Sequence, residues 1–464
     1  MIRLHTKVSG EPGPGQTGPT NGRRYYMIAI IDDSRNLLRE GLRRLEARVD
    51  HAAWAGKLCL ERLPIPRRLR GTMREHMFVP RTKEVPVDKL LLGYQGDLTG
   101  SQFAARTKDL MWTSTRVADG PHAQLLRLAS LKAPSRLTDR EILESPYGIF
   151  AGDCVAEGGQ FFGATEPQQI VAVARAFIAR YNGEPQSKVF PGQSSDGAMI
   201  GVARIRHSDY YQIVDGHHRG AAAAVSDVKS VRVRTRWLPT TTAIQGLVTR
   251  MSWIDGRREL YQPLPAPELS SGWTTVRRCS DRLEKITSFL RAEDFLPPAT
   301  KSYLDVASCY GWFVSAMGDL GYECHGIELD PLASPLGQAA YGLRPEQITI
   351  GNCVNVMRDT SQRWDVVSCF SLLHHCVLGR TDATPAQLME LLDKVTGRVL
   401  FLDSGQSHEA WFRKTMPDWS TERLMAFLQD ATQFARVIDL GPDADAVPPY
   451  EDNYGRHLFA CIRE

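Results

Sequence analysis

Seven short apolar segments recur along residues 270–464, and most of them are separated by a stretch long enough to form a helix. These segments lie near residues 303–307, 324–328, 347–350, 365–370, 398–403, 434–440 and 456–462. Strands that alternate with helices of about 10–15 residues are typical of a parallel sheet with helices on both faces. We therefore expect a doubly wound, seven-stranded, Rossmann-like α/β domain over residues 270–464. No long helix separates the last two segments, which predicts an antiparallel pair at one edge.

The part of the chain before this domain divides into three regions. Residues 1–26 are rich in Gly and Pro and too poor in apolar residues to build a core, so we expect a flexible leader. Residues 27–84, of unknown fold, contain a candidate strand at 27–31 and a candidate helix at 36–49. An α+β domain is expected over residues 85–262, with a helix at 168–181 and strands at 210–214 and 230–237. Prolines 263, 265 and 267 indicate a linker after it.

Composition excludes several classes of protein. The hydrophobic fraction of 42% and charged fraction of 23% are ordinary for a globular chain. No apolar run approaches the ~18–20 residues of a membrane span. Without an export signal, we expect a cytoplasmic protein. The nine cysteines include no Cys-x-x-Cys pair, which favours reduced thiols and gives no support for a metal site.

Charge is unevenly distributed along the chain. Residues 1–84 carry 17 Lys+Arg against 9 Asp+Glu, whereas the remainder is acidic. The basic excess lacks interleaved aromatic residues, so we interpret it as solvated helix surface rather than as a nucleic-acid arm.

A strand, a turn of small residues and a helix start are predicted over residues 303–313. The strand holds Asp305, and the turn holds Ala307, Ser308, Cys309 and Gly311. Small residues in the first turn of a doubly wound sheet let the backbone approach a ligand. An acid at the end of the next strand, about 20 residues on, takes ribose hydroxyls, and Glu328 follows Asp305 by 23 residues. The pattern predicts a nucleoside pocket.

This region resembles the class I S-adenosylmethionine-dependent methyltransferases over roughly residues 270–464. In that family the first loop reads Asp-x-Gly-x-Gly-x-Gly, and here Asp305 and Gly311 match while Ala307 and Cys309 replace two glycines. The resemblance implies S-adenosylmethionine as cofactor and Glu328 as the acid on its ribose. It also implies that Asn352 and Cys353, after the third strand, lie beside the adenine, and that Phe370 belongs to the cofactor site.

Two other interpretations of this domain stay open. A dinucleotide-binding domain would present Gly-x-Gly-x-x-Gly to a pyrophosphate at a helix N-terminus, whereas Tyr310, Trp312 and Phe313 crowd that position. A fold that has lost its activity is the second alternative.

Candidate catalytic groups follow the fourth and fifth strands. His374 and His375 come after the fourth strand, and either can serve as the general base for an oxygen or nitrogen acceptor. Asp403, Ser404 and His408 follow the fifth strand and are candidates for acceptor contact. Arg277, Arg278 and Arg282 can bind an anionic acceptor, but we favour helix surface for them.

A second strand–turn–helix pattern carries the segment Asp215-Gly216-His217-His218-Arg219. Its glycine, the helix N-terminus expected at Gly220 and the guanidinium of Arg219 suit a phosphate. The segment resembles the phosphate loop of the ParB/sulfiredoxin superfamily, in which some small-molecule kinases carry Asp-Gly-His-His-Arg. The resemblance implies ATP, ADP or CTP, with Mg²⁺, at residues 215–219. Asp88 and Asp97 are candidates for the carboxylate base of such a kinase.

Three functional hypotheses follow. The first is an enzyme that methylates a small-molecule or glycan acceptor and carries a ParB-like domain that binds or uses a nucleotide. The second is a ParB-guided DNA methyltransferase, which we disfavour because no Asp/Asn-Pro-Pro-Tyr/Phe loop follows the fourth strand; Pro448-Pro449-Tyr450 comes too late. The third is a module that binds adenosylmethionine only as a signal. A further alternative is a ParB-like small-molecule kinase with a degenerate methyltransferase domain. The sequence does not specify an oligomeric state.

Overall fold

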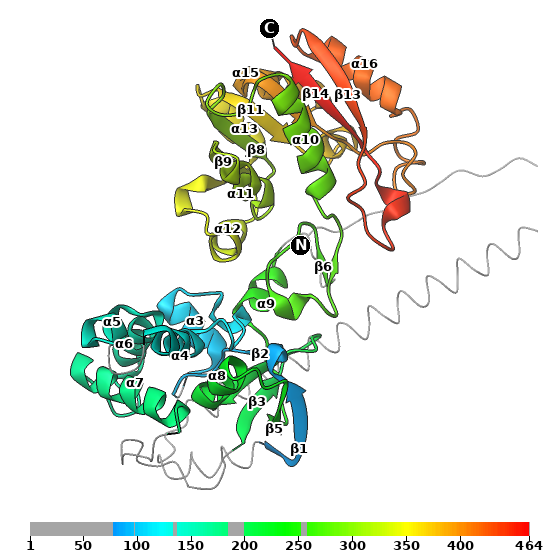
Figure 1. The fold of residues 1–464 in the computed structure, drawn as a ribbon. Helices are drawn as coiled ribbons and strands as arrows, with labels where there is room; N and C mark the ends of the chain where they lie inside the picture. The colour runs from blue at the N-terminus through cyan, green and yellow to red at the C-terminus, as the bar shows by residue number, and fades with distance from the viewer. Residues whose placement is uncertain (1–77, 97, 133–136, 184–198, 252–257, 464) are drawn as a thin grey trace, which may run out of the picture. The chain divides into compact units, whose positions relative to one another are not determined.

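The computed structural model describes residues 78–96, 98–132, 137–183, 199–251 and 258–463 (Figure 1). The chain divides into two units, Met1–Thr72 and Met73–Glu464, and every described residue belongs to the second. The predicted leader, the strand at 27–31, the helix at 36–49 and Asp97 lie outside the described residues.

The first part of the described chain contains a five-stranded mixed sheet with the strand order β1-β5-β3-β4-β2. Its strands are β1 (Phe78–Pro86), β2 (Leu90–Leu91), β3 (Ile200–Arg204), β4 (Tyr211–Asp215) and β5 (Ser230–Arg236). The pairs β1–β5 and β3–β4 are antiparallel, whereas β3–β5 and β2–β4 are parallel. The predicted strands at 210–214 and 230–237 are confirmed within a residue.

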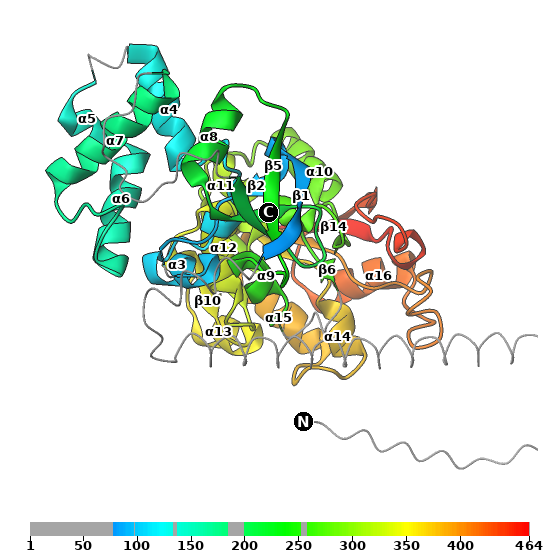
Figure 2. The same ribbon diagram turned by 90° about the horizontal axis from the view of Figure 1, so that it is seen from below.

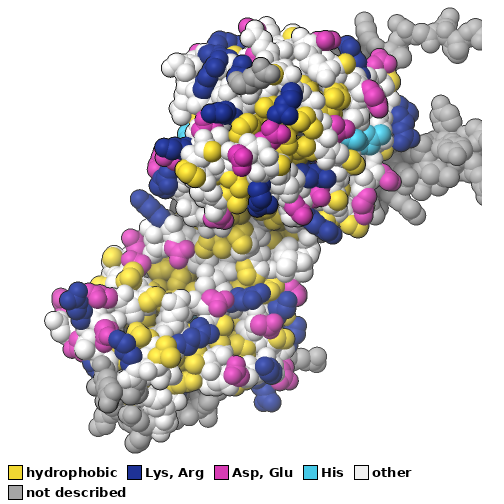
Figure 3. All heavy atoms as spheres, turned by 45° about the horizontal axis from the view of Figure 1, so that its top comes forward, with side chains coloured by type: hydrophobic (Ala, Val, Ile, Leu, Met, Phe, Trp, Pro, Cys, Tyr) yellow, Lys and Arg dark blue, Asp and Glu magenta, His cyan; other side chains and the backbone are white. Residues whose placement is uncertain are grey.

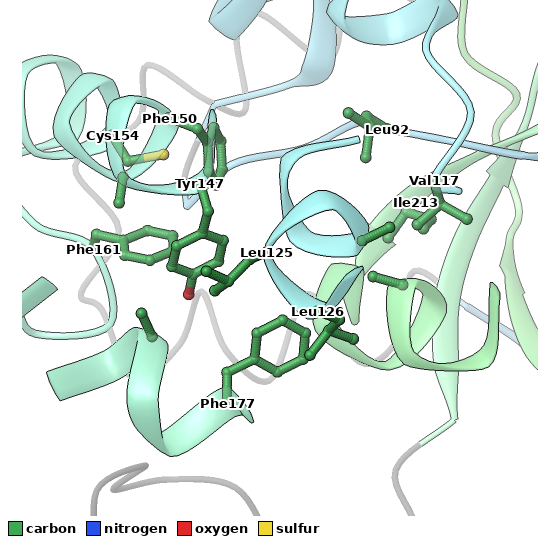
Figure 4. Close-up of a cluster of buried hydrophobic side chains, with 14 of the residues drawn as sticks. Leu92, Val117, Leu125, Leu126, Tyr147, Phe150, Cys154, Phe161, Phe177 and Ile213 are labelled. Atoms are coloured by element: carbon green, nitrogen blue, oxygen red, sulfur yellow. The ribbon is translucent and has the colours of Figure 1, made fainter. Parts of the chain in front are cut away.

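Helices α4 to α7 form one group in both ribbon views (Figures 1 and 2). The helices of this part of the chain are α3 (Gly100–Thr107), α4 (Pro121–Lys132), α5 (Asp139–Glu144), α6 (Pro146–Gly158), α7 (Pro167–Tyr181), α8 (His217–Val225) and α9 (Ala243–Val248). The predicted helix at 168–181 is α7, which begins at Pro167 after a capping box formed by Glu166 and Gln169. Its apolar residues join a core with α4, α6 and the sheet, shown in Figure 4.

Helix α8 begins three residues earlier than predicted. Gly216 adopts φ +98° and is its N-cap, so His217 and His218 lie in the first helical turn. A left-handed residue ends the strand abruptly, and glycine adopts this conformation without a steric penalty. The turn is therefore one glycine long, which the sequence pattern did not reveal.

Part of the segment 258–275 is buried, although its prolines predict a linker. It contains β6 (Glu259–Leu260), a 3₁₀ turn (Pro267–Leu269) and β7 (Thr274–Thr275), and β6 pairs in parallel with β7. Leu260 and Leu269 share an apolar cluster with Tyr310 and Leu336 of the following domain. The predicted linker therefore contributes side chains to a core of the following domain.

The second sheet has seven strands in the order β10-β9-β8-β11-β12-β14-β13. Its strands are β8 (Ser302–Val306), β9 (Glu323–Glu328), β10 (Ile348–Ile350), β11 (Trp364–Cys369), β12 (Thr396–Leu402), β13 (Arg436–Pro442) and β14 (His457–Ile462). All seven predicted strands are present. Strand β14 is antiparallel to both neighbours, β12 and β13, so the predicted antiparallel pair lies at the edge.

Helices cover both faces of this sheet, as predicted. They are α10 (Ser280–Ala292), α11 (Trp312–Asp319), α12 (Ala333–Tyr341), α13 (Cys353–Asp359), α14 (Leu373–Val377), α15 (Pro385–Val395) and α16 (Thr421–Ala431). Successive strand residues enter opposite cores: Leu400 packs with α15 and α16, whereas Phe401 packs with α10 and α11. This alternation makes the domain doubly wound.

Charged side chains are mixed on the surface. On the face in Figure 3, the described Lys and Arg side chains lie among Asp and Glu and do not gather into one basic patch. None of the helices in the described ranges combines the length and apolar character needed to cross a membrane.

Candidate active site

The loop after β8 lies where the strand order reverses. Strand β8 pairs with β9 on one side and with β11 on the other, and the connections leave in opposite directions. In open α/β sheets a ligand crevice forms at this switch point, beyond the carboxyl ends of the strands. The fold therefore places residues 307–311 at the position where a ligand is expected.

This loop has the backbone of a glycine loop although two glycines are replaced. Ala307, Cys309 and Gly311 adopt φ values of +62°, +53° and +86°. The left-handed conformation costs a non-glycine residue roughly 1–2 kcal/mol. The chain thus tolerates strain at the two positions where the resemblance leads us to expect glycine.

Glu328 is held against the loop. Its Oε2 accepts a hydrogen bond of 2.8 Å from the Cys309 amide, and its Oε1 accepts bonds from the amides of Leu329 and Asp330. Burial raises the pKa of this carboxyl, against these hydrogen bonds, which lower it. The neighbouring Leu329 is 68% exposed, an apolar side chain in solvent beside the crevice. The sequence does not indicate Leu329 as a site residue, because an exposed leucine belongs to no recognisable motif.

Asp305 lies beneath the loop and is 2% exposed. Its carboxylate accepts a 2.6 Å hydrogen bond from Ser368 of β11, and burial raises its pKa to about 7. Ser308 is also buried, and its hydroxyl has no partner in the described structure. The Asp305 side chain thus joins β8 to β11 through Ser368.

The residues expected at the adenine are spread over two elements. The Oδ1 of Asn352 accepts a 2.9 Å bond from the Val354 amide and caps α13, whose first residue is the half-buried Cys353. Strand β10 pairs with β9 so that Ile350 lies opposite Glu328, which brings Asn352 near the crevice. Phe370 is 8% exposed and packs against Phe313, with ring centroids 4.9 Å apart.

The two histidines after β11 differ in their surroundings. The Gly405 amide donates to Nδ1 of His374 at 3.2 Å, so the neutral ring carries its hydrogen on Nε2. Burial lowers the pKa of His374 to about 2. The ring of His375 lies 4.3 Å away, is more exposed, and has a pKa lowered mainly by burial. His375 is thus the more accessible of the two rings.

The expectation that Arg277 and Arg282 lie on a helix surface is wrong. Both are almost fully buried: Arg277 pairs with Asp443 at 2.5 Å, and Arg282 bonds Asp403 and Asp445, each at 3.0 Å. Their acidic partners lie more than 120 residues away in sequence, so no local pattern signals the pairing.

Arg456 completes this buried network, through a two-pronged ion pair with Glu409 and a bond to Ser371. Burial opposes ionisation of Asp403, but the guanidinium groups of Arg277, Arg282 and Arg456 outweigh it and hold the pKa at about 2. Sequence reasoning missed Arg456, Glu409 and Ser371.

The segment 215–219 forms the turn into α8. Arg219 folds back to Asp215, with its Nη2 2.8 Å from the carboxylate, and its Nη1 is buried without a partner in the described residues. A Cβ on Gly216 would lie 2.9 Å from Nη2 of Arg219, and the φ of +98° at this position favours glycine.

His217 and His218 point into the protein. The Gly93 amide donates to Nε2 of His217 at 3.1 Å, and Nε2 of His218 lies 2.8 Å from the Tyr147 hydroxyl within the aromatic core of Figure 4. Burial lowers the pKa of each to about 3, so both are neutral at pH 7. They can hold the loop in place but offer no positive charge to a phosphate.

Among the described residues, no group of three or more His, Cys, Asp or Glu side chains is arranged to hold a metal ion.

Comparisons with known proteins give only distant similarities. The sequence matches no protein-family model and no curated protein. Among solved structures, the bifunctional kinase-methyltransferase WbdD aligns at 18% identity and a TM-score of 0.36, over 47% of this chain and 46% of WbdD. The magnesium protoporphyrin IX methyltransferase ChlM from Synechocystis PCC 6803, with bound S-adenosylmethionine, aligns at 14% and 0.29, over 39% of this chain and 78% of ChlM.

The methyltransferase domain of bacterial CtHen1 aligns at 12% identity and a TM-score of 0.30, over 39% of this chain and 97% of that domain. The chain spans less than half of the length of WbdD. At these scores and identities, none of the similarities assigns an activity or a substrate to this chain.

Proposed function

We propose that the domain over residues 270–464 transfers a methyl group from S-adenosylmethionine to a small-molecule or glycan acceptor. One observation carries the proposal: at the switch point of the sheet, Glu328 is fixed 2.8 Å from the amide of Cys309 in a left-handed loop. A carboxylate held beside a close-packed turn is suited to the two hydroxyls of a ribose.

Charge favours a sulfonium ligand over a dinucleotide. The carboxylate of Glu328 borders the crevice, and its hydrogen bonds come from the backbone amides of Cys309, Leu329 and Asp330. A carboxylate at this position repels a pyrophosphate but attracts a positively charged sulfonium. Tyr310 turns away into an apolar cluster and is fully buried, so it does not plug the loop.

The protein has modest chemical demands to meet for this reaction. The cofactor supplies an already electrophilic methyl group when bound. Residues 307–311 and Glu328 then orient it, and the acceptor has to be aligned in line with the carbon–sulfur bond. His375, neutral at pH 7, is suited to take the proton of a hydroxyl or amine acceptor.

Aromatic side chains support a ring-shaped acceptor. Trp411 is 48% exposed and lies 5.7 Å from Tyr454 and 6.1 Å from Tyr450, measured between ring centroids. These residues belong to the loops that follow β12 and β13, at the same edge as the cofactor crevice. A sugar ring or another flat molecule can stack on such a surface. Pro448-Pro449-Tyr450 follows β13 rather than β11, which disfavours a DNA base as acceptor.

We also propose that the turn 215–219 binds a nucleotide phosphate, ATP, ADP or CTP, in a ParB-like domain spanning residues 85–262. The supporting observation is Arg219, whose Nη1 lacks a partner beside the first turn of α8. A helix N-terminus and a guanidinium both attract phosphate.

Calorimetry tests both proposals. The full chain is titrated with S-adenosylhomocysteine, ATP, ADP, CTP and NAD⁺. We expect binding of S-adenosylhomocysteine and of at least one mononucleotide, each without competition from the other. Binding of NAD⁺ with no response to S-adenosylhomocysteine would contradict the methyl-transfer proposal, and a steeply salt-dependent shift of duplex DNA would favour the DNA hypothesis.

A further inference from the structure

A short strap, residues 261–263, crosses the carboxyl edge of the seven-stranded sheet. Tyr261 bonds through its hydroxyl to Ser371 after β11, and the Tyr341 hydroxyl of α12 bonds to the carbonyl of Pro263. Between them, the Gln262 amide donates to the Tyr310 hydroxyl at 2.9 Å, and that hydroxyl donates to the Gln262 carbonyl. The strap thus touches the loops after β8 and β11, which border the proposed methyl-donor crevice.

The orientation of the Gln262 carboxamide follows from its partner. The Trp312 amide lies 3.2 Å from Oε1, and because a backbone N–H can only donate, the oxygen must face it. The Nε2 group therefore lies at the opposite end of the carboxamide. It makes no hydrogen bond within the described residues, although the whole residue is only 4% exposed.

The Nε2 group is therefore a hydrogen-bond donor without a protein acceptor in the described part of the chain, and an acceptor on a ligand can satisfy it. Trp312 is the first residue of α11, and Gly311, its N-cap, offers no side chain to the free amides of the first turn. The positive end of the helix dipole favours a negative charge there. Two independent features thus point to an anion beside Gln262.

We infer that Gln262 binds the carboxylate at the amino-acid end of the methyl donor, with Nε2 as hydrogen-bond donor. This inference rests on the proposed methyltransferase function and extends it to a residue outside the sheet. Glu328 would hold the ribose end of the same molecule, and the strap would hold the other end. Tyr261 positions the strap through Ser371.

Two ligands that differ only in the amino-acid end test the inference. S-adenosylhomocysteine has this end, and 5′-methylthioadenosine lacks it. In Gln262→Ala, the affinity for S-adenosylhomocysteine should fall roughly tenfold to a hundredfold, as for a hydrogen bond to a charged group, while that for 5′-methylthioadenosine stays within about twofold. Gln262→Glu keeps the acceptor for the Trp312 amide but repels a carboxylate. Its affinity for S-adenosylhomocysteine should therefore fall further than that of Gln262→Ala, while its affinity for 5′-methylthioadenosine should again change little.

Gln338→Ala, on α12, is the matched control and should leave both affinities unchanged, and thermal melting of each variant shows whether it is folded. Equal losses for the two ligands in Gln262→Ala, or no loss for either, would overturn the inference while the methyltransferase proposal stands. If the wild-type protein binds neither ligand, the methyltransferase proposal itself fails.

Discussion

The chain contains two strand–turn–helix junctions that share a backbone but differ in their charged neighbours. In one, β8 leads through Gly311, at φ +86°, into α11; in the other, β4 leads through Gly216, at φ +98°, into α8. The first junction faces the carboxylate of Glu328, and the second lies against the guanidinium of Arg219. In the functions proposed above, the same local fold binds a ribose and a sulfonium at one junction and a phosphate at the other, according to the side chain beside it.

The surroundings of the two junctions differ as well. The first adjoins a buried network of arginines and acids, whereas the second rests on neutral histidines and aromatic rings.

Breaking the buried network of arginines and acids should have the largest effect on stability. In Arg282→Ala, the buried carboxylates of Asp403 and Asp445 lose the Arg282 guanidinium, so the free energy of unfolding should fall by about 3–5 kcal/mol in urea titrations. Arg278→Ala, at the exposed neighbour, should change it little, and equal effects would contradict a structural network.

Removing the acid at the first junction should weaken the binding of S-adenosylhomocysteine but not that of a mononucleotide. In Glu328→Ala, affinity for S-adenosylhomocysteine should fall by roughly a hundredfold or more, because two hydrogen bonds from ribose to a charged group are lost. Calorimetry should show mononucleotide binding unchanged. Glu323→Ala, at the exposed start of the same strand, is the control, and a parallel loss of nucleotide binding in Glu328→Ala would argue against two independent sites.

The reciprocal change is at the second junction. Arg219→Ala should weaken mononucleotide binding by roughly tenfold to a hundredfold, since one charge-assisted contact to phosphate is removed. Affinity for S-adenosylhomocysteine should be preserved. Arg232→Ala on β5 controls for the loss of one positive charge. If Arg219→Ala binds the mononucleotide as tightly as the wild-type protein, the proposed phosphate loop loses its support.

The histidines of the second junction predict a pH dependence of stability. The pKa of folded His218 is about 3, against about 6.5 when unfolded, so below pH 6.5 the unfolded chain binds a proton that the folded chain does not. The contribution of His218 to the free energy of unfolding is complete above pH 6.5. It is lost as the pH falls, by at most ~1.4 kcal/mol per pH unit. Between pH 6.5 and 5, His218→Phe should therefore lose less stability than wild type in urea titrations. Tyr147→Phe removes the same hydrogen bond and should keep the wild-type slope.

The smallest predicted effect compares the backbone of the two turns. Ala307→Gly relieves a left-handed alanine and should stabilise the protein by up to about 1 kcal/mol, after the added freedom of the unfolded chain is counted. Gly216→Ala should destabilise it, because φ is +98° and the new Cβ meets Arg219. Thermal melting measures both; a destabilising Ala307→Gly would show that the first turn is not strained.

The sequence predicts the sheet well and the buried charges poorly. All seven strands of the second sheet lie within two residues of their predicted bounds. Their positions are predictable because the apolar pattern that indicates a strand lies within the strand's own residues. The sequence also predicts the turn after β8 and the acid Glu328 at the end of β9, because the spacing between them follows from the geometry of a strand–helix–strand unit. The partners of Arg282, and the contact of Gln262 with Trp312, join residues 50 or more positions apart, so nothing local signals them.

The central claim is that the switch point of the seven-stranded sheet binds an adenosyl sulfonium. A crystal structure of the full chain with S-adenosylhomocysteine tests it most directly. We predict that the ligand's ribose hydroxyls lie within hydrogen-bond distance of Glu328 and that its adenosine lies against residues 307–311. A crevice that stays empty at saturating ligand, or a ligand bound away from Glu328, would contradict the claim.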